Sequence, residues 1–250
     1  MQLVHPQERV YFMVSLVVSV AMYMLLVFLG QGGMIYILLA FSVVLAIRGY
    51  YVGIIRINGI RVSERQFPEI YDLAQDLSAK MGVTPMPAIY VLQKGGLLNA
   101  MATMCSGVHY IVLYSDMVEV YYEGGRDAFS FILAHELAHV KHQHIQWRMV
   151  FTPSLLILAG GYMRAAELTC DRYGAHFCPE GAKEGILLLT AGKSLYKITD
   201  TEELIKQAMA EKNKLWSSVA ASIISHPPLT QRLVEIKKYL DSRAEEDKAK

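Results

Sequence analysis

The sequence predicts an α+β fold, in which an N-terminal transmembrane helical hairpin precedes a mostly helical domain with a small β-sheet. Three observations support this prediction. No charged residue occurs from Val10 to Ile47, a run of 38 residues. Two short β-type runs follow, and the remaining segments repeat their apolar residues at helical spacing. The hydrophobic share of 53% and a mean hydropathy of +0.28 also indicate that part of the chain lies in lipid.

The uncharged run is long enough for two spans, since one membrane-spanning helix needs about 20 residues. We expect a first span from Tyr11 to Leu29, a turn at residues 30–33 (Gly-Gln-Gly-Gly) and a second span from Met34 to about Tyr51. A cleaved signal peptide is the alternative, but it predicts a shorter apolar run and an early small-residue cleavage site. The expected division is a membrane anchor at 1–56, a catalytic domain at 57–242 and a charged, frayed tail at 243–250.

The flank after the second span predicts the orientation. It carries Arg48, Arg56, Arg61 and Arg65 against Glu64 alone. Positive flanks remain on the cytoplasmic side of a membrane. We therefore expect the domain after residue 56 to face the cytoplasm from the inner membrane of the cell.

Charge and cysteine content exclude several classes of protein. The chain has 24 basic and 23 acidic residues, and no stretch combines clustered Lys and Arg with aromatic residues, so a nucleic-acid partner is not expected. Three cysteines without a CxxC pair suggest neither a disulfide framework nor a thiolate zinc site. Cys170 is expected to be a packed, unreactive thiol.

The domain reads as a helix, a small sheet and then further helices. Phe67 to Met81 has helical spacing, while Ala88 to Leu92 and Val108 to Tyr114 have the pattern of strands. A short helix after Ser115 precedes a helix from the N-cap Asp127 to about Gln143. Further helices are expected at 183–196, 202–212, 215–224 and 228–240.

The helix after Asp127 contains the motif with the clearest chemistry, His-Glu-Leu-Ala-His at 135–139. Residues four apart share one helix face, so His135 and His139 can direct both imidazoles at one ion. Glu136 then lies beside them, where it can act on a metal-bound water. The spacing predicts a zinc-dependent hydrolase with one Zn²⁺ per chain.

A catalytic zinc site needs a third protein ligand. The metzincin pattern is excluded, because it requires Gly at position 142 and His at 145. Glu167 and Asp171 share a later helix face, so Glu167 can ligate while Asp171 bonds the outer nitrogen of a ligand histidine. His142 and His144 are expected to be exposed or to support the ligands.

The uncharged stretch between Arg148 and Arg164 constrains the membrane topology. Its 15 residues, Met149 to Met163, are too few to span a bilayer. A single span here would also place Glu167 on the opposite side from His135 and His139. We expect this stretch to pack on the core or to lie in the membrane interface.

Four features in order resemble the membrane zinc metallopeptidases of the HtpX and CAAX prenyl protease family. They are Asn99-Ala100-Met101-Ala102, the His-Glu-Leu-Ala-His motif, Glu167 with Asp171, and Ser225-His226-Pro227-Pro228 followed by Arg232. The resemblance implies a gluzincin-type, zincin-like metallopeptidase domain. It implies that residues 99–102 offer a strand edge to substrate, that His226 stabilises the oxyanion and that Arg232 pairs with the acidic helix.

The expected function is a membrane-anchored zinc metalloendopeptidase that hydrolyses protein or peptide substrates at the cytoplasmic side of the bilayer. The resemblance adds a role in membrane-protein quality control. A catalytically inactive zinc-binding scaffold and a zinc hydrolase of a non-peptide substrate are the alternatives. The retention of Glu136, which ligates nothing, favours an enzyme over a scaffold. The sequence indicates no oligomeric state.

Overall fold

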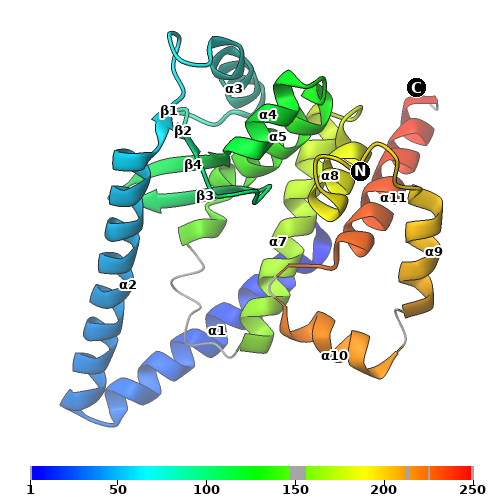
Figure 1. Cartoon of the computed structure of the whole chain (residues 1–250). Helices are drawn as coiled ribbons and strands as arrows, with labels where there is room; N and C mark the ends of the chain where they lie inside the picture. The colour runs from blue at the N-terminus through cyan, green and yellow to red at the C-terminus, as the bar shows by residue number, and fades with distance from the viewer. Residues whose placement is uncertain (1, 147–155, 212–213, 225, 249–250) are drawn as a thin grey trace.

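Figure 1 shows the computed structural model of the chain, which describes residues 2–146, 156–211, 214–224 and 226–248. The fold is α+β, as the sequence predicts. The helices are α1 (Pro6–Phe28), α2 (Gln31–Asn58), α3 (Pro68–Met81), α4 (Ser115–Tyr122), α5 (Arg126–Lys141), α7 (Leu156–Phe177), α8 (Ala182–Ala191), α9 (Thr201–Glu211), α10 (Leu215–Ile223) and α11 (Leu229–Lys248). The strands are β1 (Ile60–Arg61), β2 (Ala88–Leu92), β3 (Ala100–Cys105) and β4 (Val108–Tyr114).

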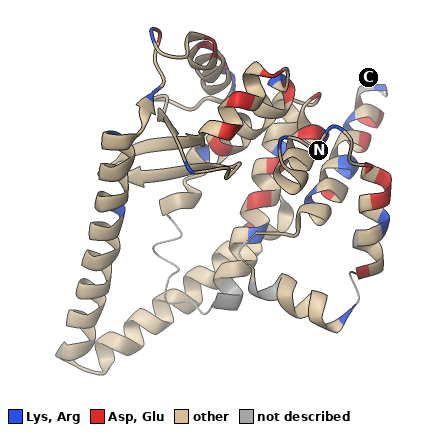
Figure 2. Cartoon of the chain, in the orientation of Figure 1, with Lys and Arg blue, Asp and Glu red and all other residues tan. Residues whose placement is uncertain are grey.

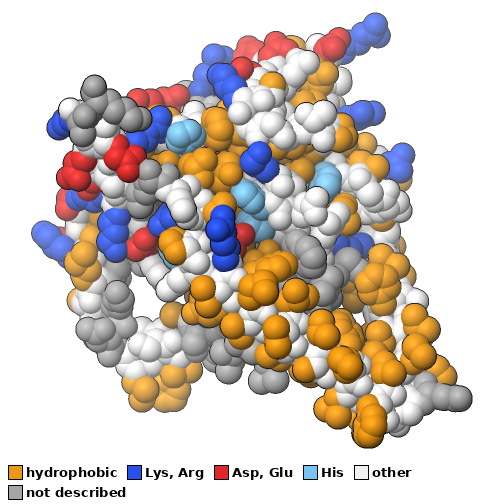
Figure 3. Space-filling view, turned by 180° about the vertical axis from the view of Figure 1, so that it is seen from behind, with side chains coloured by type: hydrophobic (Ala, Val, Ile, Leu, Met, Phe, Trp, Pro, Cys, Tyr) orange, Lys and Arg blue, Asp and Glu red, His pale blue; other side chains and the backbone are white. Residues whose placement is uncertain are grey.

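The first two helices are long and apolar enough to cross a membrane, by length and composition. Their spans have mean hydropathies of 2.4 and 2.0, and few of their side chains are buried within the chain. Figure 2 shows almost no charge along their lower parts, and apolar side chains cover the same region from behind in Figure 3. Charged side chains gather instead on the upper part of the molecule.

The connection between these helices is tighter than the predicted turn at 30–33. Only Leu29 and Gly30 lie between α1 and α2, and Gly30 has a φ of 107°, which favours glycine. From this turn α2 rises to the sheet and α1 runs back along α7 (Figure 1). The charge-free run therefore forms two helices that leave the turn in different directions.

The sheet has four strands in the order β1-β2-β4-β3. β2 and β4 are parallel and have the predicted bounds, while β3 pairs antiparallel with β4 at the edge. Successive residues of β2 alternate between two cores: Ile89 and Val91 face the main core, and Tyr90 and Leu92 pack with Val52 and Ile55 of α2. The last turns of the second apolar helix thus cover one face of the sheet.

The main core lies on the other face, around α5. Every residue of α5 from Phe131 to Val140 is buried, and α7 packs along it. The two helices approach closely at Gly174 of α7, where an added Cβ would lie 2.7 Å from the Phe131 ring. A side chain larger than glycine would therefore not fit between α5 and α7 at this position.

Several element boundaries differ from the sequence prediction. Helix α5 begins at Arg126 with Gly125 as its N-cap, so Asp127 lies in the first turn instead. Helix α8 ends at Ala191, where Gly192 takes a φ of 79°. The tail expected to fray from Arg243 is helical to Lys248, and the Arg243 side chain donates to the carbonyl of His176.

Part of the uncharged stretch at 149–163 lies outside the described residues, namely 149–155. The remainder forms the beginning of α7. There Ala159 and Tyr162 are buried and pack against Tyr11, Phe12 and Leu16 of α1. The described part of this stretch therefore packs on the first apolar helix.

We predict that Gly174→Ala lowers the free energy of unfolding by about 1–3 kcal/mol, because the new methyl group overpacks the contact with Phe131. Thermal unfolding of the full chain in detergent measures this. Gly49→Ala on α2 is the control, since its Cβ would meet nothing within 4 Å. Equal melting temperatures for Gly174→Ala and wild type would contradict the close packing.

Candidate metal centre

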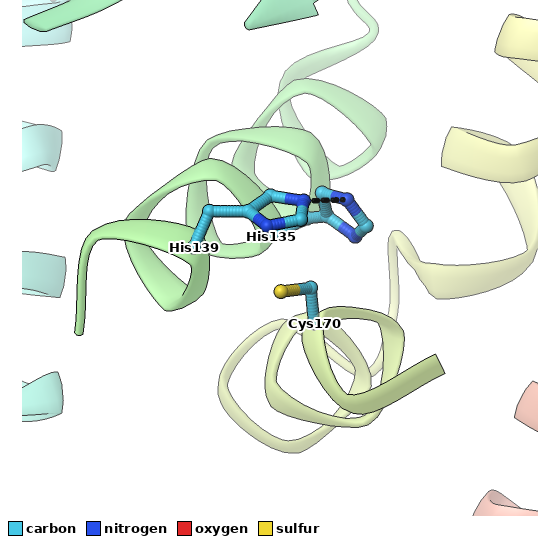
Figure 4. A group of neighbouring side chains, drawn as sticks. All are labelled: His135, His139 and Cys170. Atoms are coloured by element: carbon cyan, nitrogen blue, oxygen red, sulfur yellow. Dashed lines mark hydrogen bonds between the residues drawn. The ribbon is translucent and has the colours of Figure 1, made fainter. Parts of the chain in front are cut away.

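The motif histidines lie on one face of α5 and point at the same place. His135 and His139 are both buried, and their Nε2 atoms are 3.2 Å apart (Figure 4). Two neutral imidazole nitrogens at this distance either share one proton or present two lone pairs to the same point. Two lone pairs that face each other repel, and a cation bound between the two nitrogens removes this repulsion.

Glu167 of α7 completes the arrangement from the opposite helix. Its Oε2 lies 3.4 Å from His135 Nε2, and its Oε1 lies 3.3 Å from His139 Nε2. Tetrahedral zinc with bonds of about 2.0–2.1 Å separates its ligand atoms by roughly 3.3–3.4 Å. The two imidazole nitrogens, 3.2 Å apart, and the nearest Glu167 oxygen to each of them are close to these separations, so the three side chains fit Zn²⁺.

The electrostatics also favour a cation at this point. Burial alone would lower the pKa of His135, but its hydrogen bonds to Asp171 and Glu167 outweigh burial and raise the pKa to about 9. Burial opposes ionisation of Glu167, yet the charge of His139 and hydrogen bonds from His135 hold its pKa well below the usual range. The surroundings thus stabilise an ionised carboxylate beside positive charge.

Asp171 and Arg232 orient His135 from behind. Asp171 Oδ1 lies 3.0 Å from His135 Nδ1, which leaves Nε2 for the metal. Arg232 of α11 donates to both oxygens of Asp171, at 2.8 Å and 2.6 Å. Burial would raise the pKa of Asp171, but the Arg232 charge and its hydrogen bonds lower it. The predicted pairing of Arg232 with the acidic helix is present in this contact.

His144 occupies the corresponding position behind His139. Its Nδ1 lies 3.1 Å from His139 Nδ1, and its side chain is 1% exposed. Of the two expected positions for His144, the structure shows the one beside His139 and not the exposed one. His142 is partly buried, and burial together with the charge of His144 lowers its pKa to about 4.

Cys170 offers a different third donor, because atoms of His135, His139 and Cys170 lie within 4.8 Å of one another (Figure 4). However, its Sγ is 3.5 Å from His144 Nδ1, on the side of His139 away from Nε2. Burial also raises the pKa of the Cys170 thiol well above its usual value, as expected for a packed thiol. The geometry favours Glu167, and Cys170 is a packed thiol.

Glu136 lies beside the donor atoms and is buried. The backbone N–H of Ala102 on β3 donates to its carboxylate, while burial raises its pKa. A carboxylate held beside the donor atoms is placed to take a proton from a metal-bound water and to release it again. The edge strand and the motif helix are therefore joined at the residue expected to act as base.

A pocket collects almost every residue singled out in the sequence. Its lining is Asn99, Ala100, Met101, Ala102, Phe131, Ile132, His135, Glu136, His139, Ile145, Glu167, Leu189, His226 and Arg232. Asp171 lies behind His135. Sequence reasoning did not single out the apolar residues of this wall, nor Glu8, which contacts His144. Glu8 is a single carboxylate ahead of an apolar run, so no motif or residue spacing in the sequence predicts its contact with His144.

His226 lies against the proposed ligand. Its Nδ1 is 3.1 Å from Glu167 Oε1, while its side chain is 57% exposed at the pocket mouth. Ser225 of the same motif lies outside the described residues. The arrangement places His226 at the pocket, where the resemblance expects it, and its contact in this structure is with Glu167.

We predict that Asp171→Asn weakens zinc binding about 10–100-fold, because His135 loses the carboxylate that orients it. Stability should fall by about 3–5 kcal/mol, since the buried Arg232 loses its hydrogen-bonded counterion and keeps only Glu167 at 3.9 Å. Chelator competition and urea unfolding in detergent measure the two effects. The exposed Asp72→Asn is the control, and unchanged zinc affinity in folded Asp171→Asn would refute the orienting role.

Comparisons with known proteins point in the same direction. Residues 64–159 match the model of peptidase family M48. A protease HtpX homolog of Thermodesulfovibrio yellowstonii is 33% identical over 84 residues, which cover 34% of this chain. No solved structure matches.

The extent of these matches is limited. The family match includes the His-Glu-Leu-Ala-His motif and the Asn99–Ala102 segment but ends before Glu167. The matched stretch covers 28% of the length of the curated relative. Within these bounds both matches confirm that the chain resembles the HtpX-like metallopeptidases of family M48.

Proposed function

We propose that the chain is a membrane-anchored zinc metalloendopeptidase. One observation carries the proposal: the donor atoms of His135, His139 and Glu167 converge at zinc-ligand separations beside Glu136. Zinc bound there would act as a Lewis acid on the scissile carbonyl and on the attacking water. The family M48 match supports hydrolysis of peptide bonds.

The edge strand supports a peptide substrate. Tyr114 N–H donates to the carbonyl of Asn99, so this pair is hydrogen-bonded, and the backbone groups of Ala100 and Ala102 point away from β4. Their N–H groups bond the Asn99 side chain and Glu136, respectively. The carbonyls of Ala100 and Ala102 remain as acceptors for an extended substrate chain.

The chain's own residues then perform the proton transfers. Glu136 takes a proton from the attacking water and passes it to the leaving amine. His226 stabilises the oxyanion after it turns from Glu167 toward the substrate, and Arg232 keeps Asp171 and His135 in place. A substrate held along β3 would present its carbonyl to the same pocket.

Two other functions remain as alternatives. A scaffold that binds zinc without cleaving has no use for a buried carboxylate with a raised pKa beside the ligands. A zinc hydrolase of a non-peptide substrate has no use for a strand edge that lines the pocket. Membrane-protein quality control follows from the family resemblance alone and is the biological role that we propose.

We predict that Glu136→Gln retains zinc but lowers the rate of hydrolysis of an unfolded protein by about 10²–10⁴-fold, because the amide accepts no proton from water. Proteolysis and bound zinc are measured on the full chain in detergent. Glu180→Gln, an exposed substitution of the same type, is the control and should match wild type. Equal hydrolysis by Glu136→Gln and wild type would refute the mechanism.

We also propose that the domain faces the cytoplasm. Arg56, Arg61 and Arg65 are exposed beyond the lipid-sized part of α2 and favour that side. In intact spheroplasts a C-terminal epitope should resist added protease, and permeabilisation should expose it. An N-terminal epitope is the matched control, since two spans place both ends on one side. Digestion of the C-terminal epitope before permeabilisation would show that the domain faces the opposite side of the membrane.

A further inference from the structure

A carboxylate from the first apolar helix reaches the back of the metal centre. Glu8 lies in the first turn of α1 and is 8% exposed. Its Oε1 is 3.1 Å from His144 Nε2, and its Oε2 accepts from the hydroxyl of Thr169 on α7. The backbone N–H of His5 donates to the same hydroxyl at 2.9 Å. The start of α1 is thus bonded into the centre, although its sequence distance from His144 is 136 residues.

If His139 is a metal ligand, only one placement of the hydrogen atoms on His139 and His144 satisfies these contacts. Ligation through Nε2 requires that Nδ1 of His139 carries the proton. That N–H donates to His144 Nδ1, which lies 3.1 Å away and must then be the acceptor. A neutral His144 consequently carries its proton on Nε2, which donates to Glu8 Oε1. Every donor in this series faces an acceptor, and the series ends on a carboxylate.

We propose that Glu8 and His144 are positioning residues that hold His139 in its metal-binding orientation, so that the first apolar helix is a structural part of the metal centre. The inference rests on the proposed zinc site. His135 is oriented by Asp171 and Arg232 from α7 and α11. His139 is oriented by His144 and Glu8, from the segment after α5 and from α1.

The same residues also admit a competing arrangement. Ligand atoms of Glu8, His142 and His144 lie within 4.8 Å of one another, as in a second metal site. Such a site needs a lone pair on an imidazole nitrogen that faces Glu8, whereas His144 Nε2 must be a donor when His139 binds metal through Nε2. The two arrangements therefore predict different metal contents, one ion per chain or two.

The test measures zinc affinity by chelator competition on the full chain in detergent, with bound zinc counted separately. Glu8→Ala should weaken zinc binding about 10–100-fold, as removal of outer-shell partners commonly does. Glu8→Gln should weaken zinc binding less than Glu8→Ala does, because its amide oxygen still accepts from His144 although the carboxylate charge is lost. Gln7→Ala, an exposed neighbour on α1, is the control and should not change affinity.

Cobalt in place of zinc separates positioning from general stability. Glu8→Ala should shift the visible spectrum of bound Co²⁺, because the ring of His139 is reoriented, whereas a role in stability alone would leave the folded fraction's spectrum unchanged. If Glu8→Ala folds poorly, His144→Phe should give the same weakening. The double variant should then weaken zinc no further than His144→Phe alone, since Glu8 acts through His144.

Several results would overturn the inference. Unchanged zinc affinity and cobalt spectrum in Glu8→Ala would do so, as would two zinc ions per chain with one lost in His142→Ala. These results leave the peptidase proposal intact if wild type still cleaves protein. Conversely, weakened zinc binding in Glu8→Ala without any proteolysis by wild type would uphold the positioning role and refute the peptidase.

Discussion

The burial of opposite charges between α5, α7 and α11 is the interaction on which the centre depends. Glu167, Asp171 and Arg232 are each at most 5% exposed, and an unpaired ion in such a place costs several kcal/mol. Arg232 satisfies Asp171 through two hydrogen bonds, and Glu167 has His135, His139 and His226 around it. Three helices are therefore held together by charge balance, and α5 and α7 also pack closely at Gly174.

The two long apolar helices are also packed against the domain that holds the centre. The sheet presents one face to α5 and the other to the end of α2, and α1 packs along α7. Both long apolar helices therefore contact elements that bear functional residues. Arg48 of α2 donates to the carbonyl of Ile145, which lines the pocket. The two apolar helices are consequently packed onto the domain at two places and are part of its folded structure.

Much of this centre follows from local spacing. His135 with His139, and Glu167 with Asp171, are four apart, and helical geometry alone places each pair on one face. Strands β2 and β4 were predictable because their residues are β-branched, aromatic or apolar between turn signals. Strand β3, whose sequence is Ala-Met-Ala-Thr-Met-Cys, lacks that pattern and was expected only through the family resemblance. Glu8 was missed because a contact across 136 residues leaves no periodic trace.

The length of α2 has a consequence for substrate choice. Its 28 residues extend over about 42 Å, whereas the hydrocarbon core of a bilayer is roughly 30 Å thick. If α2 crosses once and upright, about 12 Å of rigid helix stands clear of the lipid tails, and β3 is packed against that part. The cleft would then lie at the level of the lipid headgroups. With the pocket at that fixed height above the bilayer, we expect segments next to the membrane to reach it more readily than distant loops.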